Sequence, residues 1–294
     1  MIHKPVLLKE ILEYFNPKDG DLFIDGTANG GGHTLALWNM IKPTGRVLAI
    51  DKDSKIVSSL KKKVEEGAFD INVVSGSYAD IKNIVNQKDF GNVSGILLDL
   101  GYSSYHIDES GRGFSFQKDE PLIMRYESDV KIGKDLTAYE VINSFQENEI
   151  ADILYKYGEE RFSRKIAKRI ILKRREKKIE SSLELAEVIA SVFPKRHFKI
   201  NPATKSFQAL RIFVNNELAD LENFLPNMRD ILKVGGRVAI ISFHSLEDRI
   251  VKNFFRDNKD KFKIITKKPL VPQYEEIREN PRARSAKLRI AEKI

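Results

Sequence analysis

The chain has 294 residues, of which 41% are hydrophobic and 31% charged, a composition typical of a globular protein with a sizeable core. The formal net charge of +8 favours phosphate-rich partners, and the lack of cysteine excludes disulfides and zinc–thiolate sites. No apolar run approaches the roughly 18 residues of a membrane span. Lys9 and Glu10 interrupt the region where a signal peptide would be apolar. We therefore expect a cytoplasmic protein that does not associate with a membrane.

Short apolar runs alternate with helical patterns in the first hundred residues. We expect four strands, at 21–25, 46–51, 71–76 and 95–101. Residues 34–40 and 54–65 have the apolar spacing of helices. Near-continuous Val, Ile and Leu runs separated by helices predict a parallel sheet covered on both faces.

The pattern is helical from about Asp135 to Phe193. Three hydroxyl residues followed three positions later by a carboxylate fit the capping box, at Thr137–Glu140, Ser144–Glu147 and Ser181–Glu184. The α/β pattern returns with one long amphipathic segment over Phe207–Leu232 and a strand at 237–242. A further capping box at Ser245–Asp248 predicts a helix, and strands at 262–268 and 286–294 end the chain.

These patterns indicate one α/β domain with a helical insertion. We expect the first part of the core at 1–127, the insertion at 128–205 and the second part of the core at 206–294.

A glycine-rich loop follows the first expected strand. Asp25 ends that strand and runs into GTANGGGHT, which contains Gly26, Gly30, Gly31 and Gly32. Glycines at this place let the backbone approach a ligand at the carboxyl edge of the sheet. The loop has neither the P-loop nor the GxGxxG spacing. Asp25 would repel a pyrophosphate but suits the ammonium group of a methionyl moiety, so the pattern favours S-adenosylmethionine over NAD. The alternative is a glycine-rich turn without a ligand.

Two more carboxylates and one aromatic residue are expected at the same edge. Asp51 ends the second strand, where it can bind the ribose hydroxyls or, equally well, act as a helix N-cap. Asp99 ends the fourth strand, close to where a reacting methyl group would lie. Tyr78 follows the third strand and can flank an adenine, although a packed surface aromatic is the alternative.

Several long strings of residues carry a family resemblance over nearly the whole chain. They are HKPVLLKE, DGTANGGGHT, LLDLGYSS, RGFSFQ, YGEERFSRKIA, NPATKSFQALRIFVNNEL, GGRVAIISFHSLEDRIVKNFF and NPRARSAKLR. In these strings and their order, the sequence resembles the bacterial ribosomal RNA small-subunit methyltransferase H family. The resemblance implies methylation of the N4 amine of a cytidine in small-subunit ribosomal RNA. It also implies a seven-stranded, Rossmann-like S-adenosylmethionine methyltransferase sheet with a helical insertion for substrate recognition.

The resemblance also implies a set of cofactor contacts. The family's contact residues correspond to Gly31, Gly32, His33, Asp51, Tyr78, Asp99 and His106. The chain departs from the family pattern where His106 replaces a glutamine, Asn29 a glycine and Ile123 an aspartate. Asn201 and Lys205 replace a histidine and an arginine, which removes a guanidinium group.

Catalysis on a cytosine amine requires an acceptor for its N–H groups, because the amine lone pair is conjugated with the ring. We expect Asp99, or a backbone carbonyl within 100–104, to be that acceptor; the alternative role of Asp99 is to hold the cofactor. The target base must leave its stack to enter such a pocket. Phe114, Phe116, Tyr102 and Tyr105 are candidates for stacking on the base, and a loop anchored in the core explains the two phenylalanines equally well.

A basic helical segment follows YGEERF. Its cationic residues are interrupted by one acid, Glu176, which favours phosphate contact over a plain solvated face. The predicted RNA-binding residues are Arg164, Lys165, Lys168, Arg169, Lys173, Arg174 and Arg175. Lys195, Arg196, Lys199 and Lys205 extend this basic surface, and the tail PRARSAKLR adds Arg282, Arg284, Lys287 and Arg289. The expected partner is small-subunit ribosomal RNA in an assembled or assembling subunit.

The five histidines have no ligand spacing, so no metal is expected, and His244 is interpreted as a packed or capping residue. Three alternative functions are left open. They are a methyltransferase for another nucleic acid or a protein, a ribosome-assembly or RNA-binding factor that retains the fold, and an NAD-dependent oxidoreductase.

Overall fold

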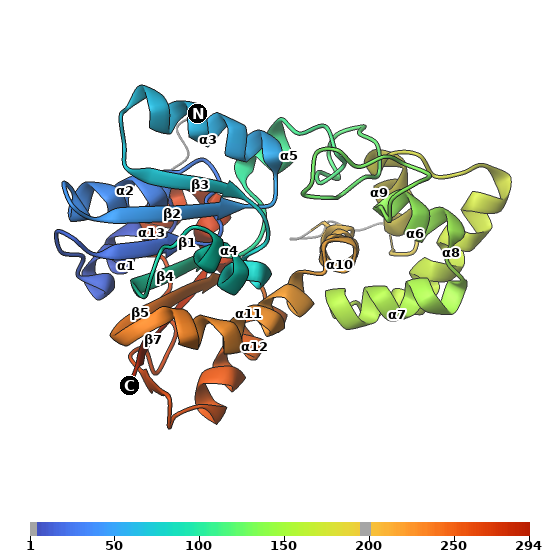
Figure 1. Cartoon of the computed structure of the whole chain (residues 1–294). Coiled ribbons are helices and arrows are strands. Elements are labelled where there is room, and N and C mark those ends of the chain that lie inside the picture. Colours follow the sequence, from blue (N-terminus) through green and yellow to red (C-terminus); the bar gives the residue numbers. More distant parts are fainter. Residues whose placement is uncertain (1–4, 195–200) are drawn as a thin grey trace. The chain divides into compact units, whose positions relative to one another are not determined.

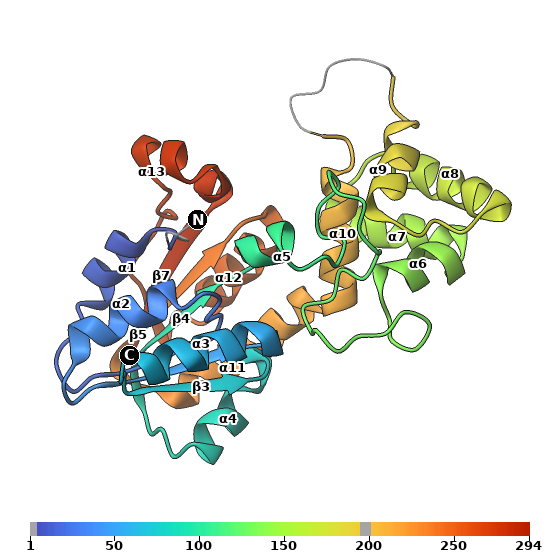
Figure 2. The same cartoon turned by 90° about the horizontal axis from the view of Figure 1, so that it is seen from above.

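The computed structural model describes residues 5–194 and 201–294. The chain forms two compact units (Figures 1 and 2). The first comprises Met1–Gly101 and Leu218–Ile294, and the second comprises Tyr102–Glu217. None of the helices in the described ranges is both long and apolar enough to span a bilayer.

The first unit is built on a seven-stranded sheet with the order β3-β2-β1-β4-β5-β7-β6. Its strands are β1 (Leu22–Asp25), β2 (Arg46–Asp51), β3 (Ile71–Ser75), β4 (Val93–Asp99), β5 (Leu232–Ser242), β6 (Phe262–Ile264) and β7 (Lys287–Lys293). The first five strands pair in parallel, whereas β7 is antiparallel to both β5 and β6. The predicted seven-stranded, Rossmann-like α/β class is therefore confirmed.

Alternating side chains of the strands bury the two faces of the sheet against different helices. Phe23, Val47 and Leu97 share a core with α1 (Leu8–Phe15), α2 (Gly32–Ile41) and α3 (Ser54–Glu66). Their neighbours Ile24, Leu48 and Leu98 share a core with α4 (Ile81–Gln87), α11 (Glu217–Ile231) and α12 (Ser245–Asp257). The period of two within each strand produces this three-layer arrangement, which Figure 1 shows. Near the carboxyl end of the chain, α13 (Tyr274–Glu279) precedes β7.

The second unit is helical. It contains α5 (Ser104–Asp108), α6 (Ala138–Ser144), α7 (Glu147–Gly158), α8 (Ser163–Glu176), α9 (Ser182–Ala190) and α10 (Thr204–Asn215). The insertion predicted at 128–205 lies within this unit. The unit also takes in the flanking segments, because Leu122 and Met124 before the helices and Leu210 on α10 belong to the same buried core.

Some local predictions are confirmed and others are wrong. Thr137 and Glu140 form the predicted capping box at α6, and the side chain of Ser181 caps α9. The other two predicted boxes are displaced along the chain: Gln146 caps α7 in place of Ser144, and His244 caps α12 in place of Ser245. Glutamine and histidine are not among the preferred N-cap residues, so the hydroxyl pattern pointed to the wrong position.

The long helix predicted over 207–232 is two helices, α10 and α11. Asn216 takes a left-handed conformation (φ 54°) at the carboxyl end of α10 and breaks the segment. Asparagine tolerates this conformation better than most residues. The strand expected at 262–268 is also shorter, because β6 ends at Ile264.

Candidate cofactor-binding site

The glycine loop between β1 and α2 is tied to the carboxyl ends of the neighbouring strands. The amide of Gly26 donates to the carbonyl of Leu97 at 2.9 Å, and that of Ala28 donates to Ile50 at 2.8 Å. Gly31 has φ +80°, and a Cβ added there would lie 2.5 Å from Leu60 Cδ1. Asn29 has φ +47°, so asparagine adopts the left-handed conformation that the resemblance expects of a glycine.

Asp25, at the end of β1, stabilises this loop through hydrogen bonds. Its carboxylate is 1% exposed and accepts hydrogen bonds from the Thr27 amide at 3.2 Å and from Thr34 Oγ1 at 2.6 Å. Burial raises the pKa of Asp25 to about 6, although both threonines favour the ionised form. The role of Asp25 toward a methionyl ammonium group stays a prediction, and the sequence gave no sign of its two threonine partners.

Asp51 points toward the same loop. Its oxygens accept from the Asn29 amide at 2.8 Å and from the Asp53 amide at 2.9 Å. The N-cap of α3 is Asp53, whose side chain accepts from the Lys55 amide, so the capping alternative for Asp51 is excluded. Asp51 is thus held at the carboxyl end of β2, where the ribose-binding prediction places a carboxylate.

Tyr78 lies beside the loop. A Cβ added at Gly26 would come within 3.2 Å of Tyr78 Cβ, and the tyrosine ring packs edge-on against Phe224 of α11 at 5.8 Å. Asp220 of α11 pairs with Lys52 and accepts a hydrogen bond from Ser77 at 3.1 Å. These contacts fix the turn that carries Tyr78. Sequence reasoning missed them because Asp220 lies more than 140 positions away from its partners along the chain.

Asp99 is the least satisfied carboxylate of this edge. It is 7% exposed, and its Oδ1 has no hydrogen-bond partner among the described residues. Its amide donates to Thr27 Oγ1 at 2.6 Å. Burial raises the pKa of Asp99 to about 8, with further contributions from the carboxylates of Asp25 and Glu247. A buried acceptor with neighbouring negative charges favours a cation or a hydrogen-bond donor at Oδ1.

His33 contacts Asp99 from α2. Its Nδ1 lies 3.8 Å from Asp99 Oδ2, and its Nε2 lies 2.9 Å from the carbonyl oxygen of Val6. Because a carbonyl only accepts, Nε2 of His33 carries a hydrogen and donates it to Val6. The predicted residues Gly31, Gly32, His33, Asp51, Tyr78 and Asp99 therefore gather at one edge of the first unit.

His106 belongs to the second unit. Its Nδ1 accepts from the Ser103 amide at 3.0 Å, which caps α5. The buried ring packs at 5.2 Å from Phe114 and 5.1 Å from Tyr126. These contacts give His106 a structural role, and its contact with the cofactor stays a prediction.

The aromatic residues suggested for base stacking differ in burial. Phe114 stacks on Tyr126 at 5.7 Å and Phe116 packs edge-on against Phe207 at 5.6 Å, which supports the anchored-loop interpretation for both phenylalanines. Tyr102 is 44% exposed, with the Arg211 guanidinium 4.5 Å from the centre of its ring.

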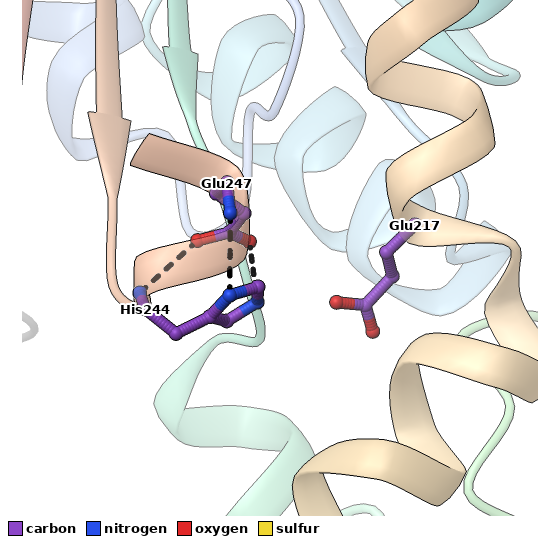
Figure 3. A group of neighbouring side chains, drawn as sticks. All are labelled: Glu217, His244 and Glu247. Atoms are coloured by element: carbon purple, nitrogen blue, oxygen red, sulfur yellow. Dashed lines mark hydrogen bonds and ion pairs between the residues drawn. The ribbon is translucent and has the colours of Figure 1, made fainter. Parts of the chain in front are cut away.

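His244 and Glu247 cap α12 beyond the carboxyl end of β5 (Figure 3). Glu247 Oε2 accepts from the Phe243 amide at 2.8 Å, and the Glu247 amide donates to His244 Nδ1 at 3.4 Å. The capping interpretation of His244 is confirmed. Glu217, also drawn in Figure 3, belongs to the second unit, where it pairs with Arg211 and accepts from the Tyr126 hydroxyl at 2.9 Å.

The predicted RNA-binding residues all lie on α8. Some make hydrogen bonds or ion pairs within the protein, and others are exposed. Arg174 donates to the carbonyls of Ile142 and Phe145, both at 2.6 Å, and Lys173 pairs with Glu176 at 3.2 Å. The exposed members are Arg164, Lys165, Lys168, Arg169 and Arg175. Ile166 and Ile170 are buried beneath them, so the helix presents most of its charge outward. Lys195, Arg196 and Lys199 lie outside the described residues.

The mostly parallel seven-stranded sheet, the glycine loop and the carboxylates at the strand ends are those of an enzyme of the Rossmann-like methyltransferase class. The model of the MraW methylase family matches residues 1–294, and the chain belongs to this family. It is a methyltransferase, as the sequence predicted.

Relatives extend this similarity over almost the full length. The chain is 47% identical over 299 residues to a protein of Thermosipho africanus named Ribosomal RNA small subunit methyltransferase H, covering 99% of this chain and 98% of the relative. A protein of the same name from Persephonella marina is 44% identical, with 99% of both chains covered. A solved structure from Clostridium thermocellum, described as a candidate rRNA methylase, covers 100% of both chains with 12% identity and a TM-score of 0.50, which shows the fold alone.

Proposed function

We propose that the chain transfers a methyl group from S-adenosylmethionine to the N4 amine of a cytidine in small-subunit ribosomal RNA. Two relatives covered almost completely are named for the small-subunit ribosomal RNA methyltransferase reaction. The structural observation that carries the proposal is Asp99, a buried carboxylate beside the glycine loop with one oxygen that has no partner among the described residues.

The residues at this edge fit S-adenosylmethionine. When bound, the cofactor supplies a methyl group on a positively charged sulfur. The backbone of Gly31 and Gly32 admits the methionyl part closely, and Asp51 accepts hydrogen bonds from the ribose. Tyr78 flanks the adenine, and His33 beside Asp99 limits the access of water to it. Ionised Asp99 attracts the positively charged sulfur of the ligand. This attraction offsets the free-energy cost of burying the carboxylate.

Asp99 is also suited to accept a hydrogen bond from the cytosine amine. A hydrogen bond from the N4 amine to Asp99 Oδ1 turns the nitrogen lone pair out of the ring plane, toward the methyl group. A backbone carbonyl within 100–104 is the alternative acceptor. Positioning of the two reactants supplies most of the acceleration, because the sulfonium is already a strong electrophile. The proton that the amine loses passes to this acceptor and then to water.

The exposed cations of α8 suit the phosphates of the RNA substrate. Arg164, Lys168 and Arg175 are exposed and have no ion pair among the described residues. Lys165 and Arg169 complete the same stretch of helix. The proposed partner is an assembled or assembling small subunit in the cytoplasm, which the names of the relatives support. No step requires a metal or a membrane.

The test is methyl transfer from labelled S-adenosylmethionine to small ribosomal subunits that lack the modification, followed by nucleoside analysis. N4-methylated cytidine is the expected product. Methylation of another nucleoside would redirect the proposal to a different nucleic-acid target. Cofactor binding without transfer to free RNA or subunits would support an assembly factor that retains the fold.

A further inference from the structure

A pocket of about 840 Å³ lies in the first unit, in a part of the sheet that the methyl-transfer site does not use. It is formed by α12, β6, β7 and the amino end of β5. Asp25 and Asp99 are at the carboxyl ends of β1 and β4, whereas Val234 and Gly235 of the pocket are near the start of β5, and β6 is the last strand of the sheet. The pocket therefore lies along β6 and β7, whereas the glycine loop follows β1. Its volume falls in the range of about 300–1,000 Å³ that is common for ligand sites.

The rim of this pocket is strongly basic. Seven cationic residues line it, namely Lys252, Arg256, Lys259, Lys263, Lys267, Arg289 and Lys293. Among the lining side chains in the described part of the chain, the one carboxylate is that of Glu292, which pairs with Arg237 at 2.8 Å. Some of the cations are already engaged, as Arg289 is with Asp248 at 2.6 Å. The side chains of Lys252, Lys263 and Lys267 are exposed and have no ion pair or hydrogen bond within the described ranges. The rim thus offers three exposed ammonium groups to an anion.

The interior of the pocket is apolar. Phe255, Phe262 and Ile290 are buried in its floor. Val234 and Ile294, 75% and 63% exposed, add apolar surface at its border, which an apolar part of a ligand could cover. A simple phosphate ion would leave this apolar surface uncovered.

We propose that this pocket is a second RNA-binding site, which holds a single-stranded segment of the substrate with its phosphates on the lysine rim and a base over the apolar floor. The inference rests on the proposed function, since that function supplies the RNA. A cationic groove beside an apolar surface is the usual arrangement for single-stranded nucleic acid. An A-form duplex keeps its bases stacked inside and would leave the floor uncovered, so a loop or an unpaired segment fits better.

The experiment compares two triple variants of the full chain that lose the same charge. Lys252→Gln, Lys263→Gln and Lys267→Gln remove the rim, whereas Lys61→Gln, Lys62→Gln and Lys88→Gln remove three exposed lysines elsewhere in the first unit. Affinity for a labelled single-stranded oligoribonucleotide is measured by fluorescence anisotropy over a range of salt concentrations. Affinity for S-adenosylmethionine is measured alongside and is expected to be unchanged in both variants.

The rim variant is expected to bind the oligoribonucleotide about 10- to 100-fold more weakly at 0.1 M salt, with a salt slope smaller by about 2, because each phosphate contact on a single strand contributes about 0.7 to the slope. A separate variant, Val234→Ser, is expected to weaken binding about two- to fivefold with the slope unchanged, because base contact is not ionic.

Equal losses in the two triple variants would overturn the proposal, because they would show only the effect of net charge. Unchanged RNA affinity in the rim variant, together with lost binding of an oligoglutamate peptide, would assign the pocket to an acidic protein segment instead. If methyl transfer to ribosomal subunits fails for the wild-type chain while the rim variant still loses RNA affinity, the proposed reaction is wrong and the second site stands.

Discussion

Asp99 lowers the stability of the ligand-free fold when it is ionised, and the same ionised form is expected to bind the cofactor. In the ligand-free protein its carboxyl is protonated at neutral pH, since burial and the neighbouring carboxylates raise its pKa to about 8. Its folded pKa lies above the unfolded value of about 3.9, so this group favours the folded state at low pH. That contribution is lost as pH rises from about 4 through 8. A cation bound at Oδ1 would offset the free-energy cost of burying the ionised carboxylate at higher pH.

Replacing Asp99 with asparagine tests both effects, the cost to stability and the contribution to methyl transfer. The amide keeps the shape of the carboxyl and cannot ionise, so we expect the ligand-free variant to melt at a higher temperature than the wild type at pH 8 and at nearly the same temperature at pH 5. Methyl transfer should fall by at least about 100-fold, because the charge is lost and the amide oxygen is a weaker acceptor that cannot take up the proton. Thermal unfolding and labelled methyl transfer measure the two effects. Normal turnover in the variant would remove Asp99 from the mechanism.

The affinity for S-adenosylmethionine should depend on pH for the same reason. Binding requires ionised Asp99, so the association constant should rise about tenfold per pH unit between pH 6 and 7.5 and level off above pH 8. Calorimetry in buffers of different ionisation enthalpy would show the release of one proton. S-adenosylhomocysteine, which has a neutral sulfur, is the control. If only the sulfonium interacts with Asp99, the control should show no pH dependence, and a flat profile for both ligands would contradict the assignment.

The site residues differ in how far the sequence could predict them. Asp51, Tyr78 and Asp99 each follow a recognisable strand, and parallel strands bring their carboxyl ends to one edge, so their gathering was predictable. The partners that hold them were not. Thr27 and Thr34 are common loop and helix residues, and Asp220 reaches Lys52 only through the packing of α11 on the sheet. No local pattern encodes such contacts.

At the scale of elements, the strands were predicted better than the helix ends. Each expected strand exists, because apolar runs of about four to eight residues rich in Val, Ile and Leu and bounded by turn residues favour strands over helices. The cap of α12 shows the opposite case. Ser245 and Asp248 have the capping spacing, yet the helix begins one residue earlier in register, with His244 and Glu247. Glu247 is 2% exposed, so tertiary burial decides the position.

Two single variants of α12 compare how much His244 and Ser245 contribute to the free energy of unfolding. His244→Ala removes the side chain that accepts from the Glu247 amide and is expected to lower the free energy of unfolding by about 1 kcal/mol. Ser245→Ala changes an exposed residue in the first turn of α12, where alanine is a good helix former, and should cost less than half as much. Urea unfolding monitored by circular dichroism compares the two. A larger loss in Ser245→Ala would restore the hydroxyl as the cap.

At the scale of the whole molecule, the excess of positive charge is concentrated in particular places. The exposed cations of α8 belong to the helical unit, and the lysine rim of the pocket belongs to the sheet unit. The sequence predicted the first because its cations are close together in one helical segment with a single acid, Glu176, among them. It did not predict the second, because residues of α12, β6 and β7 meet there only once the sheet has formed. A net charge of +8 alone could not distinguish either place from a uniformly basic surface.

The cations of α8 give the last prediction. A triple variant, Arg164→Gln, Lys168→Gln and Arg175→Gln, should raise KM for small ribosomal subunits about tenfold and leave kcat nearly unchanged, because phosphate contacts bind the substrate and its transition state equally. Steady-state methyl transfer at several salt concentrations measures this, with the Lys61, Lys62 and Lys88 variant as the control of equal charge. Affinity for S-adenosylmethionine should be that of the wild type. If α8 and the pocket contact separate stretches of one RNA, combining their variants should multiply the losses. A combined loss no larger than that of α8 alone would mean that only the helix binds the subunit.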